Sequence, residues 1–279
     1  MYRRNSTLVI CFSFFICGLM LFAVGCREYD NILPDENFFG NIYDIDGNEY
    51  KTVIIGNQEW MAENLRVSKY NNGDAIPTGL SDVEWHDATD GAYAIYPHQG
   101  GGSEDDVVGI NSDEEMVGAY GKLYNWHAVD NTRGLCPAGW HVPSDQEWTQ
   151  LVDYLMEEYD YHNVWAGSDI HGVGNALKSC RQPGSPIGGN CNTYQHPRWY
   201  PHEKHHGFDE HGFSLLPGGS RIPSGTFFIL SRSGYWWSAT EHSATYAWHR
   251  VADFDIGSLN SYFADKRNGY SVRCVKAAD

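Results

Sequence analysis

The chain has 279 residues, of which 42% are hydrophobic, and this length and composition suit one folded domain with a sizeable core. Its 36 acidic residues outnumber 19 basic residues and give a formal net charge of -17. Because so acidic a surface repels phosphate groups, we do not expect nucleic acid to be a partner. The aromatic content of 14%, with 10 Trp and 18 Tyr, indicates either a strand-rich core or an exposed binding face.

The first 25 residues have the pattern of a secretory leader. Basic residues precede an uncharged apolar run over residues 8–24, and a small residue comes directly before Cys26. Residues 23–26 resemble the lipobox of bacterial lipoproteins, which implies cleavage before Cys26 and attachment of diacylglycerol to its sulfur. The alternative is an uncleaved membrane anchor, because about 17 apolar residues are at the short end of what spans a bilayer.

Residues 26–39 are polar and acidic, and we expect them to form a tether between the lipid and a domain over residues 40–279. Arg27, not Asp, follows the cysteine, which by analogy with other lipoproteins disfavours retention in the inner membrane. The expected location is therefore the outer membrane, with the domain facing out of the cell.

The first part of the predicted domain is rich in strands and turns. Residues 42–55 alternate apolar and polar side chains around an Asp-Gly-Asn turn, a pattern typical of a β-hairpin. We interpret Asp44 and Asp46 as turn residues rather than calcium ligands, because an EF-hand loop needs Gly at its sixth position and Glu at its twelfth. Residues 58–65 continue the sheet or form a bend, and residues 71–118 are predicted to be loop-rich.

The clearest local signal predicts a strand followed by a helix. Residues 139–142 form a short apolar run that Pro143 ends. Ser144 and Glu147 have the spacing of a capping box, so we expect the helix to begin at Ser144. A stripe of apolar residues with helical period then indicates the side that packs on a sheet. Its members are Trp148, Leu151, Val152, Leu155 and Met156.

The remaining segments predict one more helix and a strand-rich C-terminal part. Leu123, Trp126 and His127 share one helix face and predict a helix over residues 120–129. Residues 160–212 are rich in Gly, Pro and His and are expected to be irregular. Short runs between turn residues then predict strands at residues 213–216, 226–230, 235–238, 245–251 and 270–275.

Residues 135–151, LCPAGWHVPSDQEWTQL, resemble the core of the Fibrobacter succinogenes major paralogous domain, a family of surface lipoproteins frequent in Bacteroidetes. Six further segments are similar to the same family, at residues 44–48, 53–65, 120–126, 212–221, 234–240 and 269–275. More distantly, residues 141–148 resemble a run in formylglycine-generating enzymes, whose fold belongs to the C-type lectin group. The resemblance implies an α+β, C-type-lectin-like domain, with a twisted antiparallel sheet, two helices and long irregular loops.

Four cysteines remain in the domain once Cys26 is acylated, and they are expected to be oxidised in an exported protein. Four cysteines allow three pairings. Cys180 and Cys191 flank a short loop of Pro and Gly, and Cys136 would meet Cys274 if the central and terminal strands lie side by side. We therefore predict these two disulfides, with free buried thiols as the alternative.

No catalytic residue, metal ligand or cofactor is predicted. Formylglycine-generating enzymes bind copper through a cysteine pair near the C-terminus, and no such pair stands at matching positions here. Residues 202–206 match HExxH, in which two His would hold zinc and Glu would act as base. Because Pro201 and Gly207 bracket this string, we interpret it as a surface loop. The alternative is a looser zinc site that includes His196, Asp209, Glu210 and His211.

Aromatic residues in the C-terminal part give the predicted binding face. Trp140 and the pair at residues 236–237 lie in strand-like runs and are interpreted as core. The segment over residues 245–268 mixes aromatic and charged side chains, which provide contact area with little loss of entropy. The predicted ligand contacts are Tyr246, Trp248, Arg250, Tyr262 and Lys266. For Tyr246 and Trp248, a place in the core is the alternative.

These observations favour a non-enzymatic lipoprotein, anchored to the cell surface by its lipid, that binds a glycan or a protein ligand. Two alternatives stay open. One is a metal-dependent enzyme of the cell envelope related to formylglycine-generating enzymes, and the other is a structural subunit of the cell surface.

Overall fold

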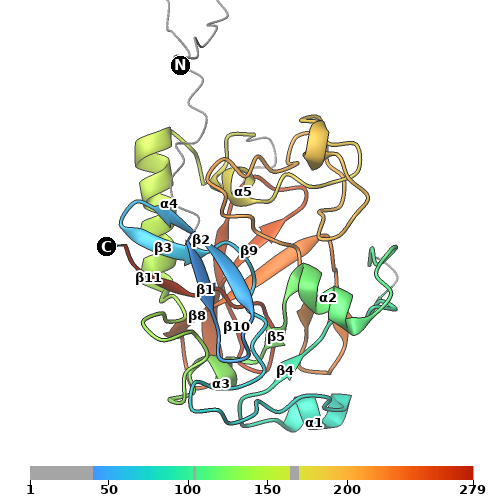
Figure 1. Cartoon of the computed structure of the whole chain (residues 1–279), viewed down its shortest axis with the longest axis vertical. Helices are drawn as coiled ribbons and strands as arrows, with labels where there is room; N and C mark the ends of the chain where they lie inside the picture. Colours follow the sequence, from blue (N-terminus) through green and yellow to red (C-terminus); the bar gives the residue numbers. More distant parts are fainter. Residues whose placement is uncertain (1–39, 103–104, 164–169, 279) are drawn as a thin grey trace, which may run out of the picture. The chain divides into compact units, whose positions relative to one another are not determined.

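A computed structural model describes residues 40–102, 105–163 and 170–278 of the chain. The predicted leader, the lipid attachment site at Cys26 and the tether lie outside these residues. Within them, no helix is both long and apolar enough to pass through a membrane. Antiparallel sheets, helices and long irregular segments make up this part of the chain (Figure 1), so the α+β class is confirmed at this level.

The first and last strands of the described domain belong to one antiparallel sheet. Its order is β1 (Asn41–Tyr43), β2 (Glu49–Ile55), β3 (Gln58–Met61) and β11 (Val275–Ala277). The predicted hairpin is confirmed as β1 and β2. The Asp44 carboxylate closes its turn by accepting hydrogen bonds from the backbone N–H groups of Asp46 at 2.9 Å and Asn48 at 3.0 Å.

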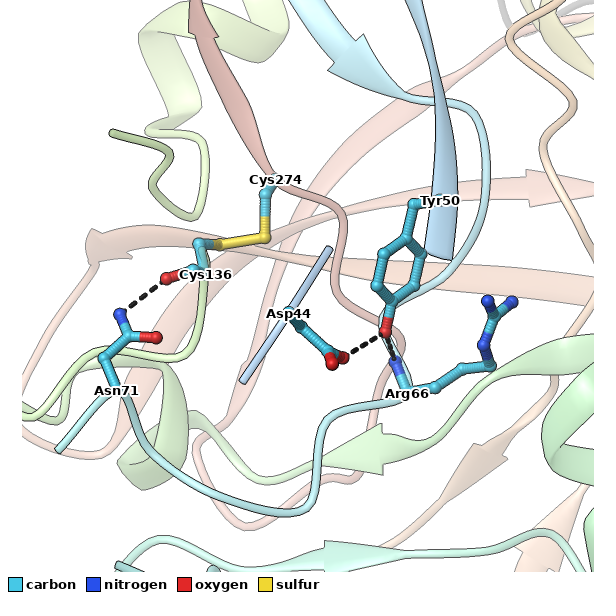
Figure 2. Close-up of a disulfide and its surroundings, with 6 residues drawn as sticks. All are labelled: Asp44, Tyr50, Arg66, Asn71, Cys136 and Cys274. Carbon is cyan, nitrogen blue, oxygen red and sulfur yellow. Dashed lines mark hydrogen bonds between the residues drawn. A yellow bond between two sulfur atoms is a disulfide. The ribbon is translucent and has the colours of Figure 1, made fainter. Parts of the chain in front are cut away.

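The same carboxylate connects the hairpin to the next segment of the chain. The buried Tyr50 hydroxyl donates to Asp44 at 2.7 Å and accepts from the Arg66 backbone N–H at 2.8 Å (Figure 2). The Arg66 guanidinium lies 4.5 Å from the centre of the Tyr50 ring. Asp44 is therefore used inside the turn, as the turn interpretation expects.

A second antiparallel sheet has the order β10 (Asn260–Asp265), β9 (Tyr246–Asp253), β8 (Ser233–Glu241). Two further pairs of short strands are also present. They are β4 (Tyr93–Ala94) with β5 (Leu123–Tyr124), and β6 (Ser220–Arg221) with β7 (Phe227–Phe228).

The strand predictions for this region are only partly right. β7, β8 and β9 correspond to predicted strands, whereas residues 213–216 form no strand and β10 was not predicted. Before β11, residues 270–274 pair only through isolated bridges, from Tyr270 to Tyr124 and from Ser271 to Trp236.

Helix α4 (Asp145–Tyr159) begins where the capping box predicts. The Ser144 hydroxyl accepts from the Glu147 N–H at 3.2 Å, and the Glu147 carboxylate accepts from the Ser144 N–H at 2.8 Å. Four members of the predicted stripe are buried, namely Trp148, Leu151, Val152 and Leu155, and Met156 is partly buried.

The buried stripe of α4 belongs to a hydrophobic cluster to which both larger sheets contribute. The cluster includes Trp60 of β3, Val275 of β11 and Trp236 of β8. Figure 1 shows α4 beside β3 and β11. The Trp148 and Trp60 ring centres are 4.7 Å apart, a distance at which aromatic rings attract one another beyond their burial of apolar area.

The prediction of one helix over residues 120–129 is wrong. Helix α2 (Asp113–Tyr120) ends at Gly121, whose positive φ of 78° suits glycine and whose N–H bonds to the Val117 carbonyl. Strand β5 and the short helix α3 (Trp126–Val129) follow. The apolar spacing in this segment reflects separate tertiary contacts rather than one helix face.

The predicted fold has two helices, and the structure contains more. The described residues contain α1 (Asp82–Asp87), α5 (Val173–Leu177) and a 3-10 turn (Gly189–Cys191) as well. Helices α1 and α2 lie in the segment predicted as loop-rich. Their capping residues, Ser81 and Ser112, were the available sequence signal, since each side chain accepts from a backbone N–H of the first turn.

Both predicted disulfides are present, Cys136 with Cys274 and Cys180 with Cys191. His141 forms a bridge with Val275, so the segments that follow Cys136 and Cys274 do lie side by side. Residues 139–142 contribute only this bridge and not the predicted strand. Beside the first disulfide, the Asn71 amide donates to the Cys136 carbonyl at 2.6 Å (Figure 2).

Candidate functional site

The sheet of β8, β9 and β10 has a face that is covered at one end and open at the other. Cross-strand pairing places Arg250 opposite Trp236 and Ser261, and Trp248 opposite Phe263. Because alternate residues of a strand share a face, these side chains lie on the same side of the sheet. Trp236 and Arg250 are buried against α4, whereas Trp248 and Phe263 lie farther along the strands.

The open end contains four ring side chains, His242, Tyr246, Trp248 and Phe263, which we call the aromatic cluster. His242 lies nearly parallel to Phe263, with ring centres 4.1 Å apart. Trp248 is 5.2 Å from His242 and 5.8 Å from Phe263, and Tyr246 is 5.8 Å from Phe263. Phe263 is 50% exposed and Tyr246 is 41% exposed. The cluster is therefore an ordered aromatic surface that faces solvent.

The turn between β8 and β9 fixes this arrangement. The backbone N–H groups of His242 and Ser243 both donate to the Tyr246 carbonyl at 2.9 Å, and the Ser243 hydroxyl accepts from the Tyr246 N–H at 3.2 Å. A register shift between Trp237 and Glu241 precedes the turn. These bonds hold the His242 ring over Phe263 before any ligand arrives.

Charged pairs lie around the aromatic cluster. Lys266 donates to Glu241, and Arg267 bonds to Asp265 at 2.7 Å. The hydrogen bond from Arg267 lowers the pKa of Asp265 below its ordinary value, so this carboxylate stays ionised. An aromatic centre with a polar rim is the composition that protein interfaces share.

Two of the predicted ligand contacts, Arg250 and Lys266, are buried, which argues against them as contacts. Arg250 is 3% exposed and donates to the Asp145 carboxylate and, at 2.9 Å, to the Thr149 hydroxyl. Lys266 is 6% exposed and lies 4.4 Å from the centre of the Trp126 ring. Strand alternation did place Arg250 on the aromatic face, but the N-terminus of α4 covers that part of the face.

The other three predicted contacts do not form one group. Tyr246 and Trp248 belong to the aromatic cluster, in which Trp248 is half-buried beside His242. Tyr262 is 39% exposed but pairs with His249 on the opposite face of the sheet. As ligand contacts, these three tyrosine and tryptophan side chains stay a prediction.

His242 and Phe263 were missed by sequence reasoning. Phe263 lies on β10, which is not predicted as a strand from the sequence, although alternation through Ser261 and Phe263 was a usable signal. No comparable signal existed for His242, because its position follows from the turn and from the pairing of β9 with β10.

The HExxH string at residues 202–206 lies in a loop, but it is only partly a surface loop, because His205 and His206 are buried. The His202 ring stacks on His205 with centres 4.9 Å apart, and its Nδ1 accepts from the His205 N–H at 2.9 Å. His206 instead bonds through Nδ1 to the Glu203 carbonyl. The two His of the motif therefore do not share a helix face, as its zinc chemistry requires.

The looser zinc site is not assembled either. His196 bonds to the Tyr120 hydroxyl at 2.6 Å, His211 lies against the Tyr159 ring, and the Asp209 carboxylate accepts from Ser214. Across the described parts of the chain, no three His, Cys, Asp or Glu side chains are placed to hold one metal ion.

Comparison with known proteins gives a family and no individual relative. The sequence model of the family described as the Fibrobacter succinogenes major domain matches residues 53–276. No curated protein and no solved structure matches the chain. Because the family match covers most of the 279 residues, the chain belongs to the Fibrobacter succinogenes major domain family.

Proposed function

We propose that this chain is a non-enzymatic recognition protein that binds a glycan or a protein ligand through the aromatic cluster. The observation that supports this most is the ordered exposure of Tyr246 and Phe263 on neighbouring strands, with the half-buried Trp248 ring beside Phe263. Phe263 is 50% exposed, and leaving half of an aromatic ring in water does not stabilise the fold. A group of exposed apolar rings is typical of a surface that binds a ligand.

The chemistry of the cluster suits both ligand classes. Tyrosine and tryptophan provide large contact areas with few rotatable bonds, and their polar atoms bond at the edge of the contact. The flat faces of such rings pack against sugar rings or against apolar side chains of a protein. Since the turn at His242 already orders the rings, binding costs little conformational entropy.

The contacts of the four cysteines and of the HExxH residues favour binding over catalysis. Cys136 and Cys274 are joined to each other, as are Cys180 and Cys191, so these four are not copper-binding thiols. The HExxH residues form a loop in which the ring of His202 stacks on His205. Neither observation supports the metal-dependent alternative.

The proposed location is the outer membrane, facing out, with a lipid on Cys26 as the anchor. The leader pattern and the lipobox-like junction support the anchor, and the two disulfides fit an oxidising compartment outside the cytoplasm.

We also propose that the domain has the C-type-lectin-like fold. Two features support this: the first strand, β1, and the last strand, β11, belong to one sheet, and the described residues between α4 and β6 contain only the short helix α5 and a 3-10 turn as regular structure. Solving the crystal structure of the mature protein and superposing it on lectin-type domains tests this part of the proposal.

The function is tested by screening the purified, detergent-solubilised full-length protein on glycan and surface-protein arrays. We expect reproducible binding to a narrow set of ligands in a preparation stripped of metal by a chelator. Binding that appears only when zinc or copper is restored, or turnover of an array ligand, contradicts the proposal.

A further inference from the structure

A groove separate from the aromatic cluster runs along the outer face of α4. Its volume is 490 Å³, and it lies between the helix and the tight turn at Gly56 and Asn57 that joins β2 to β3. This volume is within the range that small-ligand sites have in proteins. The groove lies outside every motif that the sequence singled out as a site.

The turn and the helix are fixed to each other, so the groove is preformed. The Gln150 amide donates to the Asn57 side chain at 2.6 Å. Gly56 has a φ of 61°, and a Cβ at this position would approach the Tyr154 ring to 3.1 Å, which shows how closely the turn packs on that ring. Below the turn, the Gln58 side chain donates to the Glu147 carbonyl at 3.0 Å.

The lining combines hydrogen-bonding groups of both kinds with one aromatic ring. Gln146, Gln150, Asp153 and Glu157 follow one line along α4, because successive members are three or four residues apart. Asn57 faces them, and Tyr154 contributes its ring. The carboxamides donate and accept hydrogen bonds, while the carboxylates only accept.

The charge of the residues that line the groove disfavours anionic ligands. Asp153 and Glu157 are acidic, and no Lys or Arg is among the residues that line the groove. An anionic ligand such as a phosphate or a uronic acid would meet like charge with no compensating cation. A ligand with many hydroxyl groups satisfies both the amides and the carboxylates, and its apolar ring faces pack on Tyr154.

We propose that this groove binds a short neutral oligosaccharide. Sugar hydroxyls donate to Asp153 and Glu157 and accept from the amides of Asn57 and Gln150. The site is independent of the aromatic cluster, so it adds a second contact to the recognition function rather than restating it.

The test uses isothermal titration calorimetry on the full-length protein in detergent. The probes are the neutral tetrasaccharides of glucose, mannose and xylose, with tetragalacturonate as the acidic counterpart and tetralysine as the basic one. We expect one or more neutral probes to bind and tetragalacturonate not to bind. Gln150→Ala and Asp153→Ala are each expected to weaken that binding by about tenfold.

Glu158→Ala is the matched control, because Glu158 is exposed on the same helix and does not line the groove. The proposal is overturned if no neutral probe binds, if the groove variants bind as well as the control, or if only tetralysine binds. A double Tyr246→Ala, Phe263→Ala variant separates the two sites. Loss of sugar binding in that variant alone assigns the sugar to the aromatic cluster and rejects the groove, whereas retained binding there supports the groove.

Discussion

Arg250 of β9 bonds to Asp145, the first residue of α4, through both the carboxylate and, at 3.0 Å, the backbone carbonyl of Asp145. Burial lowers the pKa of Arg250 from its ordinary value, but the adjacent Asp145 keeps the guanidinium paired and charged. At this contact, α4 covers one half of the face of the sheet formed by β8, β9 and β10. The other half, which contains Trp248 and Phe263, is not covered by the helix.

The first prediction concerns this contact. Arg250→Met keeps an apolar stem of similar length and removes the bonds to Asp145, Thr149 and Ser261. We expect it to reduce the free energy of unfolding by about 2 to 3 kcal/mol, because several charge-assisted bonds are lost at a buried position. Urea unfolding followed by tryptophan fluorescence measures the change. If this variant were as stable as the native protein and lost only ligand binding, Arg250 would be a ligand contact after all.

The second prediction concerns the two disulfides. Cys136 and Cys274 are 138 residues apart and Cys180 and Cys191 are 11 apart, so the longer loop restricts the unfolded chain more. In the chain-entropy model the paired Cys→Ser substitutions cost at most about 5 kcal/mol for the long loop and about 3 kcal/mol for the short one.

Urea unfolding of the two double variants gives this comparison, and a reductant added to the native protein should reproduce the sum of their effects. A larger loss from the Cys180 and Cys191 pair would contradict the ranking. It would show that the loop they close contributes more to folding than the connection between the central and terminal segments.

The third prediction is a pH dependence that arises from His249. This side chain is buried on the other face of the sheet, with its ring centre 4.9 Å from that of Tyr270 and near those of Tyr235, Trp237 and Tyr262. Burial, followed by the charge of Arg250, lowers the pKa of His249 from 6.5 to about 3. Between these two values the unfolded chain binds a proton that the folded chain does not.

Stability is therefore expected to fall as the pH drops from 6.5 toward 3, by as much as about 1.4 kcal/mol for each pH unit from this one group. His249→Phe should flatten that part of the profile, measured as unfolding free energy against pH relative to the native protein. Equal slopes in the native protein and the variant would show that His249 titrates normally in the folded state.

What was predictable from sequence depended on signals close together in the chain. The capping box of Ser144 and Glu147 fixed the start of α4, and the Asp-Gly-Asn turn fixed the hairpin of β1 and β2, because both involve neighbouring residues. The Cys136 to Cys274 disulfide joins distant residues, yet it followed from the expected adjacency of two strand-like segments.

What was not predictable depended on packing between distant segments. The burial of Arg250 is caused by α4, whose first residue lies 105 positions earlier in the chain. Lys266 is buried because it pairs with Glu241 and lies over Trp126. Alternation along a strand assigns a residue to a face, but it contains no information on which part of that face another element covers.

The last prediction separates binding from stability at the aromatic cluster. Tyr246→Ala combined with Phe263→Ala removes two exposed rings of the cluster, and their loss should weaken binding to the ligand found on the arrays by about 2 to 4 kcal/mol. Because both side chains already face solvent, the melting temperature should change by no more than about 3 °C.

Tyr194→Ala is the matched control, since Tyr194 is 76% exposed and lies outside the cluster. This control should alter neither ligand binding nor the melting temperature. Equal binding by all three proteins would place the ligand elsewhere. Unfolding of the double variant, with binding per folded molecule preserved, would show instead that these rings stabilise the edge of the sheet.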